Sequence, residues 1–554
     1  MILASRETID HYTQAGVYSD LTLMDRLAVH VENDPDKICI ADPPNRKDLN
    51  GFDPERLTYA QFQSAVDNTA KGLKDLGLVK DDVVMVQLPN SWELAMLYFA
   101  VSKAGGIISP TPVLWREAEL GYIAAQTEAK VFITLDEFNG FGHMDMGKKL
   151  AKAYPCLAHV LNLQALRDMS KKESHTPLDD IHVDANDIFT ICWTSGTEAR
   201  SKGCPLSHNN WAGMALIQDA AGMKAGDVML TAGPLVNMGA VGTILIPWAV
   251  LGGTLVLHHP FDPQAFMQQI MTEKPNYTLL VPAVANMIAK HPAVDQFDLS
   301  SFRTITLGSA PPSVWTMQEF KKRWDIDIGN IWGQNEGTGF ISGIEDVPNM
   351  ELRATSFPHY GKKGVEWKTV ASKYLIAKLV DPLGNEVTQI GEVGELVYKG
   401  PGVMAGYYKA PEINKDAFTE DGFLRTGDIF RVEENDCISF YERAKDIIIR
   451  GGFNISSQEI ENYLMAHPKA QDVAVVGMPD ENLGERMCVY VVPAPDQELS
   501  LEELVTFLEG EGVAKYKHPE RLEVVEMIPR NPVGKVLKKN LRQDILSKIG
   551  IVTK

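Results

Sequence analysis

Over its first 350 residues the chain alternates short apolar runs with longer segments of helical periodicity. The runs lack the regular polar residues of a half-exposed strand, so strands formed from them are buried on both faces. Buried strands joined by crossover helices form a parallel sheet, and this part of the chain therefore predicts an α/β fold. The clearest strand and helix pairs are 83–88 with 92–104, 131–135 with 146–154, and 278–281 with 283–289.

The pattern changes after residue 370. Strand-like runs at 374–380 and 394–399 stand between glycine turns, which indicates a smaller and more antiparallel β unit. From Asp446 onward the pattern is typical of a small α+β domain. Its expected elements are a helix at 457–465, strands at 472–476 and 487–492, and a helix at 501–508.

The charge balance limits the partners of this chain. Its 554 residues contain 53 Lys and Arg against 73 Asp and Glu, a formal charge of -20. A net acidic field repels polyanions, which argues against nucleic acid or an anionic membrane as a partner. Any anionic ligand must then be bound by cations placed locally. The six cysteines form no C-x-x-C pair, so neither a zinc knuckle nor a disulfide framework is indicated and a reducing cytosol is expected.

One stretch has to be weighed as a membrane span, because residues 233–261 contain no Lys, Arg, Asp or Glu. Pro247 and the pair Gly252-Gly253 interrupt it, whereas a spanning helix needs about 20 apolar residues in a row. We expect a buried helix, a turn and a strand instead. Residues 1–20 hold acidic residues and no apolar core of a signal peptide, and residues 552–554 are not a peroxisomal address, so a cytoplasmic location is expected.

The most informative segment is 193–203, WTSGTEARSKG, which directly follows the strand-like run 189–192. Backbone N–H groups in a glycine turn, small hydroxyls and a cation are the groups that a polyphosphate needs. Taken alone, such a segment is more often only a loop. A second match, G-x-x-x-x-G-K at 142–148, continues with Lys149 where a P-loop needs a Ser or Thr hydroxyl, so we do not expect a nucleotide there.

Other segments rich in glycine, proline and charge follow in order along the chain. They are GSAPP at 308–312, IWGQNEG at 331–337, GEL at 394–396, Gly406-Tyr407, LRTGD at 424–428, RAKDIIIRGGFNI at 443–455 and PRNPVGK at 529–535. Each is compatible with turn chemistry by itself. Their order and spacing together do not easily arise by chance.

Together these segments, between residues 88 and 539, resemble the adenylate-forming superfamily of acyl-CoA synthetases, peptide-synthetase adenylation domains and beetle luciferases. The resemblance implies a large N-terminal AMP-binding domain, residues 1–443, with two α/β subdomains and a β-barrel-like unit. It also implies a small mobile α+β lid, residues 444–554, that rotates between two half-reactions. The first half-reaction joins a carboxylate to the α-phosphate of ATP and releases pyrophosphate. In the second, a thiol takes the acyl group and AMP leaves.

That chemistry explains why cations and backbone dipoles recur in these segments. A carboxylic acid is already ionised at pH 7, so the obstacle is repulsion between two anions and the charge that builds on the phosphate. By the resemblance, Thr197, Lys202, Glu336 and Lys535 would be catalytic, and Glu336 would bind magnesium. The residues implied to bind the nucleotide are Thr194, Ser195, Gly196, Thr197, Lys202, Ser309, Ala310, Pro311, Trp332, Gly333, Gln334, Asn335, Asp428, Arg443 and Lys535.

Some implied roles are more specific. Trp332 would stack on adenine, Asp428 would accept hydrogen bonds from the ribose hydroxyls, and Lys535 would reach the acid carboxylate and the α-phosphate. Lys445 occupies the position of the hinge. The tunnel for the pantetheine arm of CoA would be lined by Arg450, Gly451 and Gly452.

The acyl pocket is implied at Asn237, Met238, Gly239, Gly308 and Gly333. In acetyl-CoA synthetases a Trp follows the adenine-stacking aromatic residue and closes this pocket, whereas this chain has Gly333. We therefore expect a medium-chain, alicyclic or aromatic acid rather than acetate. Nothing after Lys535 resembles a carrier-protein domain, so CoA is the expected acceptor, with ATP and Mg²⁺ as the other requirements.

Four positions depart from the family pattern: Glu198, Asn237, Asn335 and Glu442, which stand for the usual Thr, His, Thr and Gly. None of them removes a charge that the reaction depends on. An enzyme that loads a separate carrier protein, a luciferase-like oxygenase, a P-loop kinase and a non-catalytic nucleotide-binding protein remain as alternatives. The sequence also leaves open the acid, the physiological direction and the oligomeric state, a homodimer included.

Overall fold

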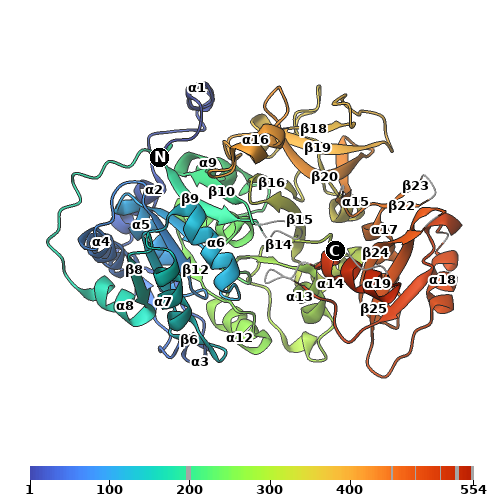
Figure 1. Cartoon of the computed structure of the whole chain (residues 1–554), viewed down its shortest axis with the longest axis horizontal. Coiled ribbons are helices and arrows are strands. Elements are labelled where there is room, and N and C mark those ends of the chain that lie inside the picture. The colour runs from blue at the N-terminus through green and yellow to red at the C-terminus, as the bar shows by residue number, and fades with distance from the viewer. Residues whose placement is uncertain are drawn as a thin grey trace. The chain divides into compact units, whose positions relative to one another are not determined.

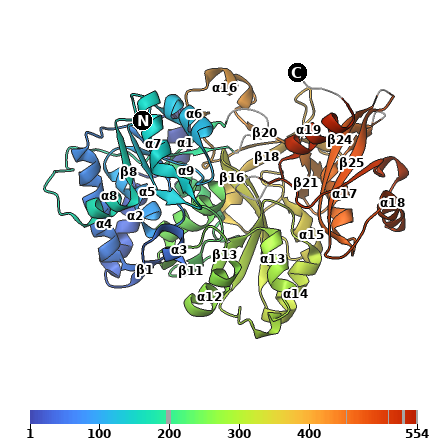
Figure 2. The same ribbon diagram turned by 60° about the horizontal axis from the view of Figure 1, so that its bottom comes forward.

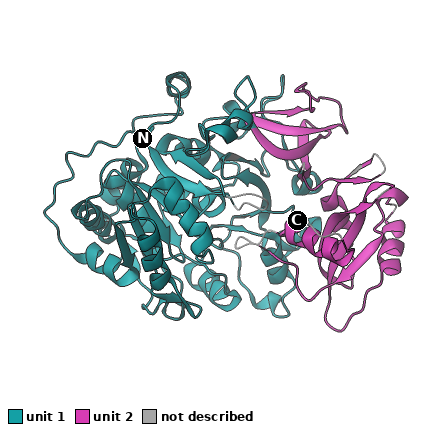
Figure 3. Cartoon of the chain, viewed as in Figure 1, with its two compact units in different colours: residues 1–194, 200–376, 399–424 teal, residues 195–199, 377–398, 425–554 magenta. Residues whose placement is uncertain are grey.

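The chain is described by a computed structural model that covers residues 1–194, 201–443, 445–450, 453–480, 482–511, 513–530 and 536–550 (Figure 1). Its internal contacts divide it into two compact units, which are coloured separately in Figure 3. Unit 1 comprises residues 1–194, 200–376 and 399–424, and unit 2 comprises residues 195–199, 377–398 and 425–554. The expected domain boundary after residue 443 stays a prediction.

The parallel sheet expected from the sequence is present in unit 1 as two sheets. The first has six strands in the order β10 (Gly203–Ser207), β9 (Ile188–Trp193), β4 (Ile107–Pro110), β3 (Val83–Gln87), β5 (Val131–Thr134) and β8 (His159–Asn162). All neighbours in it run parallel except β9 and β10. Helix α5 (Trp92–Lys103), which connects β3 to β4, is buried along almost its whole length because α4 (Tyr59–Asp75) packs against its outer face.

The second sheet of unit 1 has eight strands. Their order is β16 (Gly337–Ser342), β15 (Asp327–Gln334), β14 (Thr304–Gly308), β13 (Tyr277–Leu280), β11 (Val228–Leu230), β12 (Thr254–Val256), β1 (Ile38–Ala41) and β2 (Arg56–Thr58). Only the two edge pairs, β15 with β16 and β1 with β2, are antiparallel. Helices α13 (Pro282–Ala289) and α14 (Val314–Trp324) contact each other beside it and share its apolar core (Figure 2).

The uncharged stretch 233–261 forms the helix, turn and strand that the sequence predicts. A short helix α10 (Met238–Ala240) continues through a π-helical turn at Val241–Leu245 into α11 (Ile246–Leu251), and β12 follows. Gly253 has a φ of +97°, and a Cβ there would lie 2.0 Å from the carbonyl oxygen of Asp227, so only glycine fits the turn. Among the residues that the structure describes, no helix is long and apolar enough to cross a membrane.

The segment at 142–148 is the start of a helix rather than a loop around a phosphate. Gly142 is the N-cap of α7 (His143–Ala153), and His143, Met146 and Gly147 are buried in the first turns. This agrees with the rejection of a P-loop from the sequence.

Unit 2 contains a β unit followed by an α+β portion. In the β unit, β18 (Ile376–Val380), β19 (Val393–Lys399), β20 (Leu424–Val432) and β21 (Cys437–Arg443) pair in that order. The later elements are β22 (Ile448–Arg450), β23 (Phe453–Ile455), α17 (Ser457–Met465), β24 (Ala470–Asp480), β25 (Gly484–Pro493), α18 (Leu501–Gly510), β26 (Arg521–Val524) and α19 (Lys538–Lys548). The helices and strands expected after Asp446 are thus confirmed, with longer strands than the sequence indicated.

Candidate active site

The candidate phosphate loop connects β9 to the antiparallel edge strand β10. Its two ends are joined by two hydrogen bonds: Thr194 N donates to the Lys202 carbonyl and Lys202 N donates to Thr194 Oγ1, both at 3.0 Å. Thr194 and Lys202 are therefore held next to each other at the carboxyl end of β9, where open α/β sheets bind ligands. The predicted phosphate-binding residues Ser195, Gly196 and Thr197, together with the departure at Glu198, lie outside the described residues.

Lys202 and Glu336 are connected through the phenol of Tyr407. Lys202 Nζ donates to Tyr407 Oη at 3.3 Å and lies 4.4 Å from the centre of the tyrosine ring. The phenol in turn donates to Glu336 Oε1 at 2.8 Å. The structure thus brings together the lysine assigned to phosphate and the glutamate assigned to magnesium. Tyr407 received no role from the sequence, although it stands in the quoted Gly406-Tyr407 segment.

Asn335 joins two other parts of the site. Its Oδ1 accepts a hydrogen bond from Met238 N, and its Nδ2 donates to the carbonyl of Trp193, both at 2.8 Å. Met238 is the first residue of α10, and its N–H has no acceptor inside that helix. Asn335 therefore caps the helix that begins the expected acyl wall and ties it to the end of β9. Its predicted contact with the nucleotide stays a prediction.

The expected adenine segment lies on two neighbouring parallel strands. Gly308, the last residue of β14, is in register with Ile331 of β15, which places the turn at Ser309, Ala310 and Pro311 beside Trp332. Ser309 has a φ of +73°, which is uncommon for a residue with a side chain. Trp332 is half-buried and its ring lies 5.6 Å from that of Phe340. Gln334 pairs with Gly337 at the tip of the β15 and β16 hairpin.

Two of the expected acyl-pocket glycines face the same side chain. A Cβ at Gly239 would lie 3.8 Å from Leu279 Cδ2, and a Cβ at Gly308 would lie 3.5 Å from Leu279 Cδ1. Leu279 is half-buried in β13 and was not singled out from the sequence, because it is one apolar residue in an apolar strand. A Cβ at Gly239 would also lie 3.2 Å from Asn237 Oδ1. Asn237, Gly239 and Gly308 are therefore neighbours in space.

Gly333 also has a packing role. A Cβ at this position would lie 3.3 Å from Gly339 Cα across the β15 and β16 hairpin. That is closer than the backbone easily allows, so two glycines let the two strands approach at this point. The sequence explained Gly333 only by the space it leaves beside Trp332.

In unit 2, Asp428 and Arg443 face each other on β20 and β21. The two residues are in register, and Arg443 Nε lies 3.6 Å from Asp428 Oδ1. Asp428 is buried, and its backbone N–H donates to Thr426 Oγ1, which itself donates to the carbonyl of Leu396. The carboxylate and the guanidinium that the sequence assigns to the nucleotide thus belong to one local arrangement.

Glu442, a departure from the family pattern, is bound to the start of α17. Its Oε2 accepts hydrogen bonds from Ser457 Oγ at 2.5 Å and from Gln458 N at 2.9 Å. Ser457 Oγ also accepts a hydrogen bond from Lys538 Nζ, and Lys538 forms an ion pair with Glu461 at 3.0 Å. Burial lowers the pKa of Lys538, but the carboxylates of Glu461, Glu442 and Asp446 raise it more, so its pKa ends above the ordinary value.

The remaining lid positions are only partly described. The backbone carbonyl of Lys445, the predicted hinge, accepts a hydrogen bond from Arg542 at 3.1 Å. Arg450 donates from Nε to Glu520 Oε1 at 2.7 Å. Gly451, Gly452 and Lys535 lie outside the described residues, so their predicted roles rest on the sequence.

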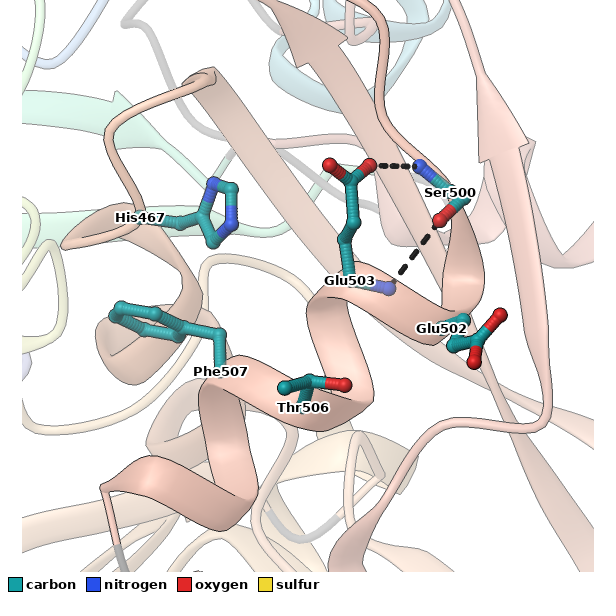
Figure 4. Close-up of a pocket in the computed structure, with 6 residues that line it drawn as sticks. All are labelled: His467, Ser500, Glu502, Glu503, Thr506 and Phe507. Atoms are coloured by element: carbon teal, nitrogen blue, oxygen red, sulfur yellow. Dashed lines mark hydrogen bonds between the residues drawn. The ribbon is translucent and has the colours of Figure 1, made fainter.

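A surface recess beside α18 is not a second site. His467, Ser500, Glu502, Glu503, Thr506 and Phe507 line it (Figure 4). Ser500 and Glu503 form a capping box in which each side chain binds the other residue's backbone N–H, at 3.2 and 2.9 Å. These polar groups thus stabilise the helix end and have no need of a ligand.

The fold and the clustered residues define an α/β protein with a ligand site at the carboxyl ends of its parallel strands. The chain belongs to the AMP-binding enzyme family: the family model matches residues 27–408, and the model of the AMP-binding enzyme C-terminal domain matches residues 459–535. It is therefore an adenylate-forming enzyme that uses ATP, as the resemblance found in the sequence implies. The mixed α/β fold with a large N-terminal and a smaller C-terminal domain is that of these enzymes.

The curated relatives act on different kinds of acid. The chain is 32% identical to the medium-chain fatty-acid–CoA ligase of Escherichia coli (strain K12) over 556 residues, which cover 97% of this chain and 93% of that protein. It is 31% identical to the 2,3-dihydroxybenzoate-AMP ligase of Bacillus subtilis (strain 168) over 504 residues, 89% of each chain.

Solved structures have the same fold. The ATP-bound crystal structure of MatB from Rhodopseudomonas palustris superposes with a TM-score of 0.82 at 25% identity, covering 96% of this chain and all of that one. The anthranilate CoA ligase AuaEII in complex with anthranoyl-AMP has a TM-score of 0.82 at 21% identity, covering 96% and 98%.

Proposed function

We propose that the protein is an AMP-forming carboxylate–CoA ligase. The carboxylate oxygen of the acid attacks the α-phosphorus of ATP and pyrophosphate leaves. The sulfur of CoA then attacks the carbonyl carbon of the acyl-adenylate, the thiol proton is lost and AMP leaves. The observation that carries the proposal is the connection of Lys202, at the end of the phosphate loop, with Glu336 through Tyr407.

The protein's part in the first half-reaction is electrostatic. The acid is ionised at neutral pH and needs no base, so the barrier comes from bringing two anions together. Lys202 stands at the loop end that would hold the β- and γ-phosphates, and it offsets their charge. Lys535, assigned from the sequence, would do the same at the α-phosphate and the acid carboxylate. Trp332, Asp428 and Arg443 would bind the adenosine and ribose part of the nucleotide.

Glu336 fits a magnesium ion that is bound mostly by the substrate. Among the residues that the structure describes, no three His, Cys, Asp or Glu side chains are grouped as metal ligands. A single half-buried carboxylate with phosphate oxygens and water completing the shell is what Mg²⁺ prefers. When bound, the ion would withdraw charge from the phosphate oxygens. Glu336 would supply the protein's carboxylate ligand to it.

The acid is proposed to be larger than acetate. Because Gly239 and Gly308 have no Cβ atom, neither residue covers the side chain of Leu279. Gly333 has no side chain either. The wall is apolar with one polar group, Asn237, which is typical of pockets for small organic acids. The relatives named for a medium-chain fatty acid and for dihydroxybenzoate support a medium-chain, alicyclic or aromatic acid.

CoA is proposed as the acceptor, with Arg450, Gly451 and Gly452 lining its tunnel after the lid, residues 444–554, turns about Lys445. The similarity to CoA ligases supports this. A second candidate is an enzyme that delivers the acyl group to a separate carrier protein. The similarity to the pyochelin synthase PchD of Pseudomonas aeruginosa and to the 2,3-dihydroxybenzoate-AMP ligase favours that candidate.

A panel of acids assayed with ATP, Mg²⁺ and CoA tests the function. The panel spans acetate, propionate, medium-chain, alicyclic and aromatic acids, and the products are identified by mass. We expect AMP, pyrophosphate and an acyl-CoA from the medium-chain, alicyclic or aromatic acids. Turnover of acetate or propionate alone would refute the acid class. Acyl-adenylate that forms without any CoA-dependent AMP release would select the carrier-protein candidate, and ADP as product would refute the reaction.

A further inference from the structure

The hydroxyl of Tyr407 accepts one hydrogen bond and donates another, which no other side chain of similar shape can do. It accepts from the ammonium of Lys202 and donates to the carboxylate of Glu336. A hydroxyl carries one donor and lone pairs, so it can do both at once. Tyr407 is 7% exposed, and little water therefore reaches it to replace either contact.

The position of the ring is fixed by the backbone around it. Tyr407 N donates to Asn414 Oδ1 at 2.7 Å, and Asn414 Nδ2 donates back to the Tyr407 carbonyl at 3.0 Å. Tyr408 N donates to the carbonyl of Gly203, the first residue of β10, at 2.9 Å. The segment is thus anchored to α16 (Pro411–Ala417) on one side and to β10 on the other, independently of Lys202 and Glu336.

A lysine and a glutamate this close attract each other, more strongly in a half-buried place than in water. If they formed a direct ion pair, a nucleotide would have to break it before the lysine met a phosphate and the glutamate met a metal. The neutral phenol separates the charges and gives each a defined direction. Breaking a hydrogen bond to a phenol costs less than separating two charges.

We propose that Tyr407 is a positioning residue for the β- and γ-phosphate end of the nucleotide: it keeps Lys202 and Glu336 oriented and apart until the triphosphate binds between them. The role rests on the proposed function, because it assumes that Lys202 meets phosphate and Glu336 meets the metal. It also predicts that the phenol matters for ATP and not for AMP, since AMP has no β- or γ-phosphate.

Calorimetric titration of Tyr407→Phe with ATP and Mg²⁺, in the absence of acid, tests the proposal. The substitution keeps the ring under Lys202 and removes only the hydroxyl. We expect ATP to bind about tenfold more weakly, which equals about 1.4 kcal/mol, while AMP binds as it does to the unsubstituted protein. The adjacent Tyr408→Phe is the matched control, because that ring belongs to the apolar core near Trp193, and it should leave both affinities unchanged.

Unchanged ATP affinity in Tyr407→Phe would overturn the proposal, and so would an equal loss for ATP and AMP, which would indicate general damage. The pair Tyr407→Phe and Lys202→Met gives a second measurement. In the Lys202→Met background, removal of the phenol should cost less than the tenfold expected in the original chain, and an additive loss would contradict the connection. Because no acid is turned over, an ATP-specific loss would stand even if the acid panel refuted the ligase.

Discussion

Unit 1 and unit 2 each contain a lysine that is joined to a glutamate through a hydroxyl group, and the two differ in their surroundings. In unit 1 the members are Lys202, Tyr407 and Glu336, and the two charged residues are half-buried. In unit 2 they are Lys538, Ser457 and Glu442; Glu442 is 2% exposed and the side chain of Lys538 is 12% exposed. The two sets thus contain the same kinds of functional group, and they differ in the exposure of those groups to water.

In unit 2, neighbouring residues make further hydrogen bonds and ion pairs with Glu442 and Lys538. Glu442 accepts from the backbone N–H groups of Gln458 and Arg443, each at 2.9 Å, and Lys538 pairs with Glu461. Buried charges that are fully bonded stabilise one arrangement of the chain and have no capacity left for a ligand. The two groups therefore differ in how many bonds their charged side chains make, and we expect this difference to separate a structural group from the proposed catalytic one. Residue types alone do not separate them.

The largest expected effect tests the catalytic side of this comparison. Lys202→Met should lower the rate of acyl-adenylate formation by about 10²- to 10³-fold, because the charge that offsets the phosphates is lost. The melting temperature should change little, since the lysine is not deeply buried. The measurement is pyrophosphate exchange together with thermal unfolding.

Lys409→Met is the matched control for Lys202→Met. This lysine is exposed and pairs with Glu128, so its removal should change neither the rate nor the melting temperature. If the Lys202→Met protein melted several degrees lower and kept its rate, Lys202 would have a structural role and not a catalytic one.

The second expected effect tests the structural side. Lys538→Met should destabilise the α17 region by about 3 kcal/mol, because Glu461 and Glu442 are left buried without their cation. Hydrogen exchange of peptides from α17 and α19 should show the loss, with the exchange of β3 and α5 in unit 1 as the internal control. Unchanged protection of α17 would show that the unit 2 group contributes no stability.

A further expected effect concerns the response of unit 1 to acid. Burial lowers the pKa of His143, His258 and His259 to about 4 and that of His208 to about 3, and all four belong to unit 1. The unfolded chain binds these protons near pH 6.5 and the folded unit does not. The stabilisation that comes from keeping these histidines neutral is therefore fully present above pH 6.5, and it decreases as the pH falls from 6.5 towards 4.

Two carboxyl groups of unit 1, Asp42 and Asp346, act against the histidines, because burial raises the pKa of each. Burial raises the pKa of Asp42 to about 6, so its contribution to stability grows as the pH falls from 6 towards 4. All nine tryptophans lie in unit 1, so tryptophan fluorescence against pH follows that unit selectively. We therefore expect unit 1 to lose structure in acid before unit 2 does. Tryptophan emission that stays unchanged to pH 4.5, while hydrogen exchange in α18 of unit 2 increases, would contradict this order.

Much of the fold follows from local pattern. The strands at 83–88, 131–135 and 278–281 and the helix at 457–465 occur where the sequence predicts them, because apolar periodicity and turn residues are properties of neighbours along the chain. The antiparallel direction of β10 and β16 was not foreseen. The direction of an edge strand depends on the strand with which it pairs, and its own residues do not identify that partner.

The candidate site divides in the same way. Lys202, Glu336, Asn335 and Gly308 were recognised from segments whose residue types suit phosphate and carboxylate chemistry. Tyr407 received no role although it stands in a quoted segment, and Leu279 was not singled out, since neither residue type indicates a function by itself. Asn335 was noted for its donor group, but its contacts join it to Met238, 97 positions away, and to Trp193, 142 positions away.

The motifs and the apolar periodicity were enough to identify the class of the protein and the groups available for its chemistry, because each motif and each repeat consists of residues close along the chain. The surroundings of those groups depend on the tertiary structure. It placed a phenol between Lys202 and Glu336 in a half-buried site, and a serine between Lys538 and Glu442 in a buried one. A charged group is stabilised by the polar groups around it, and these come from residues that are distant in the sequence.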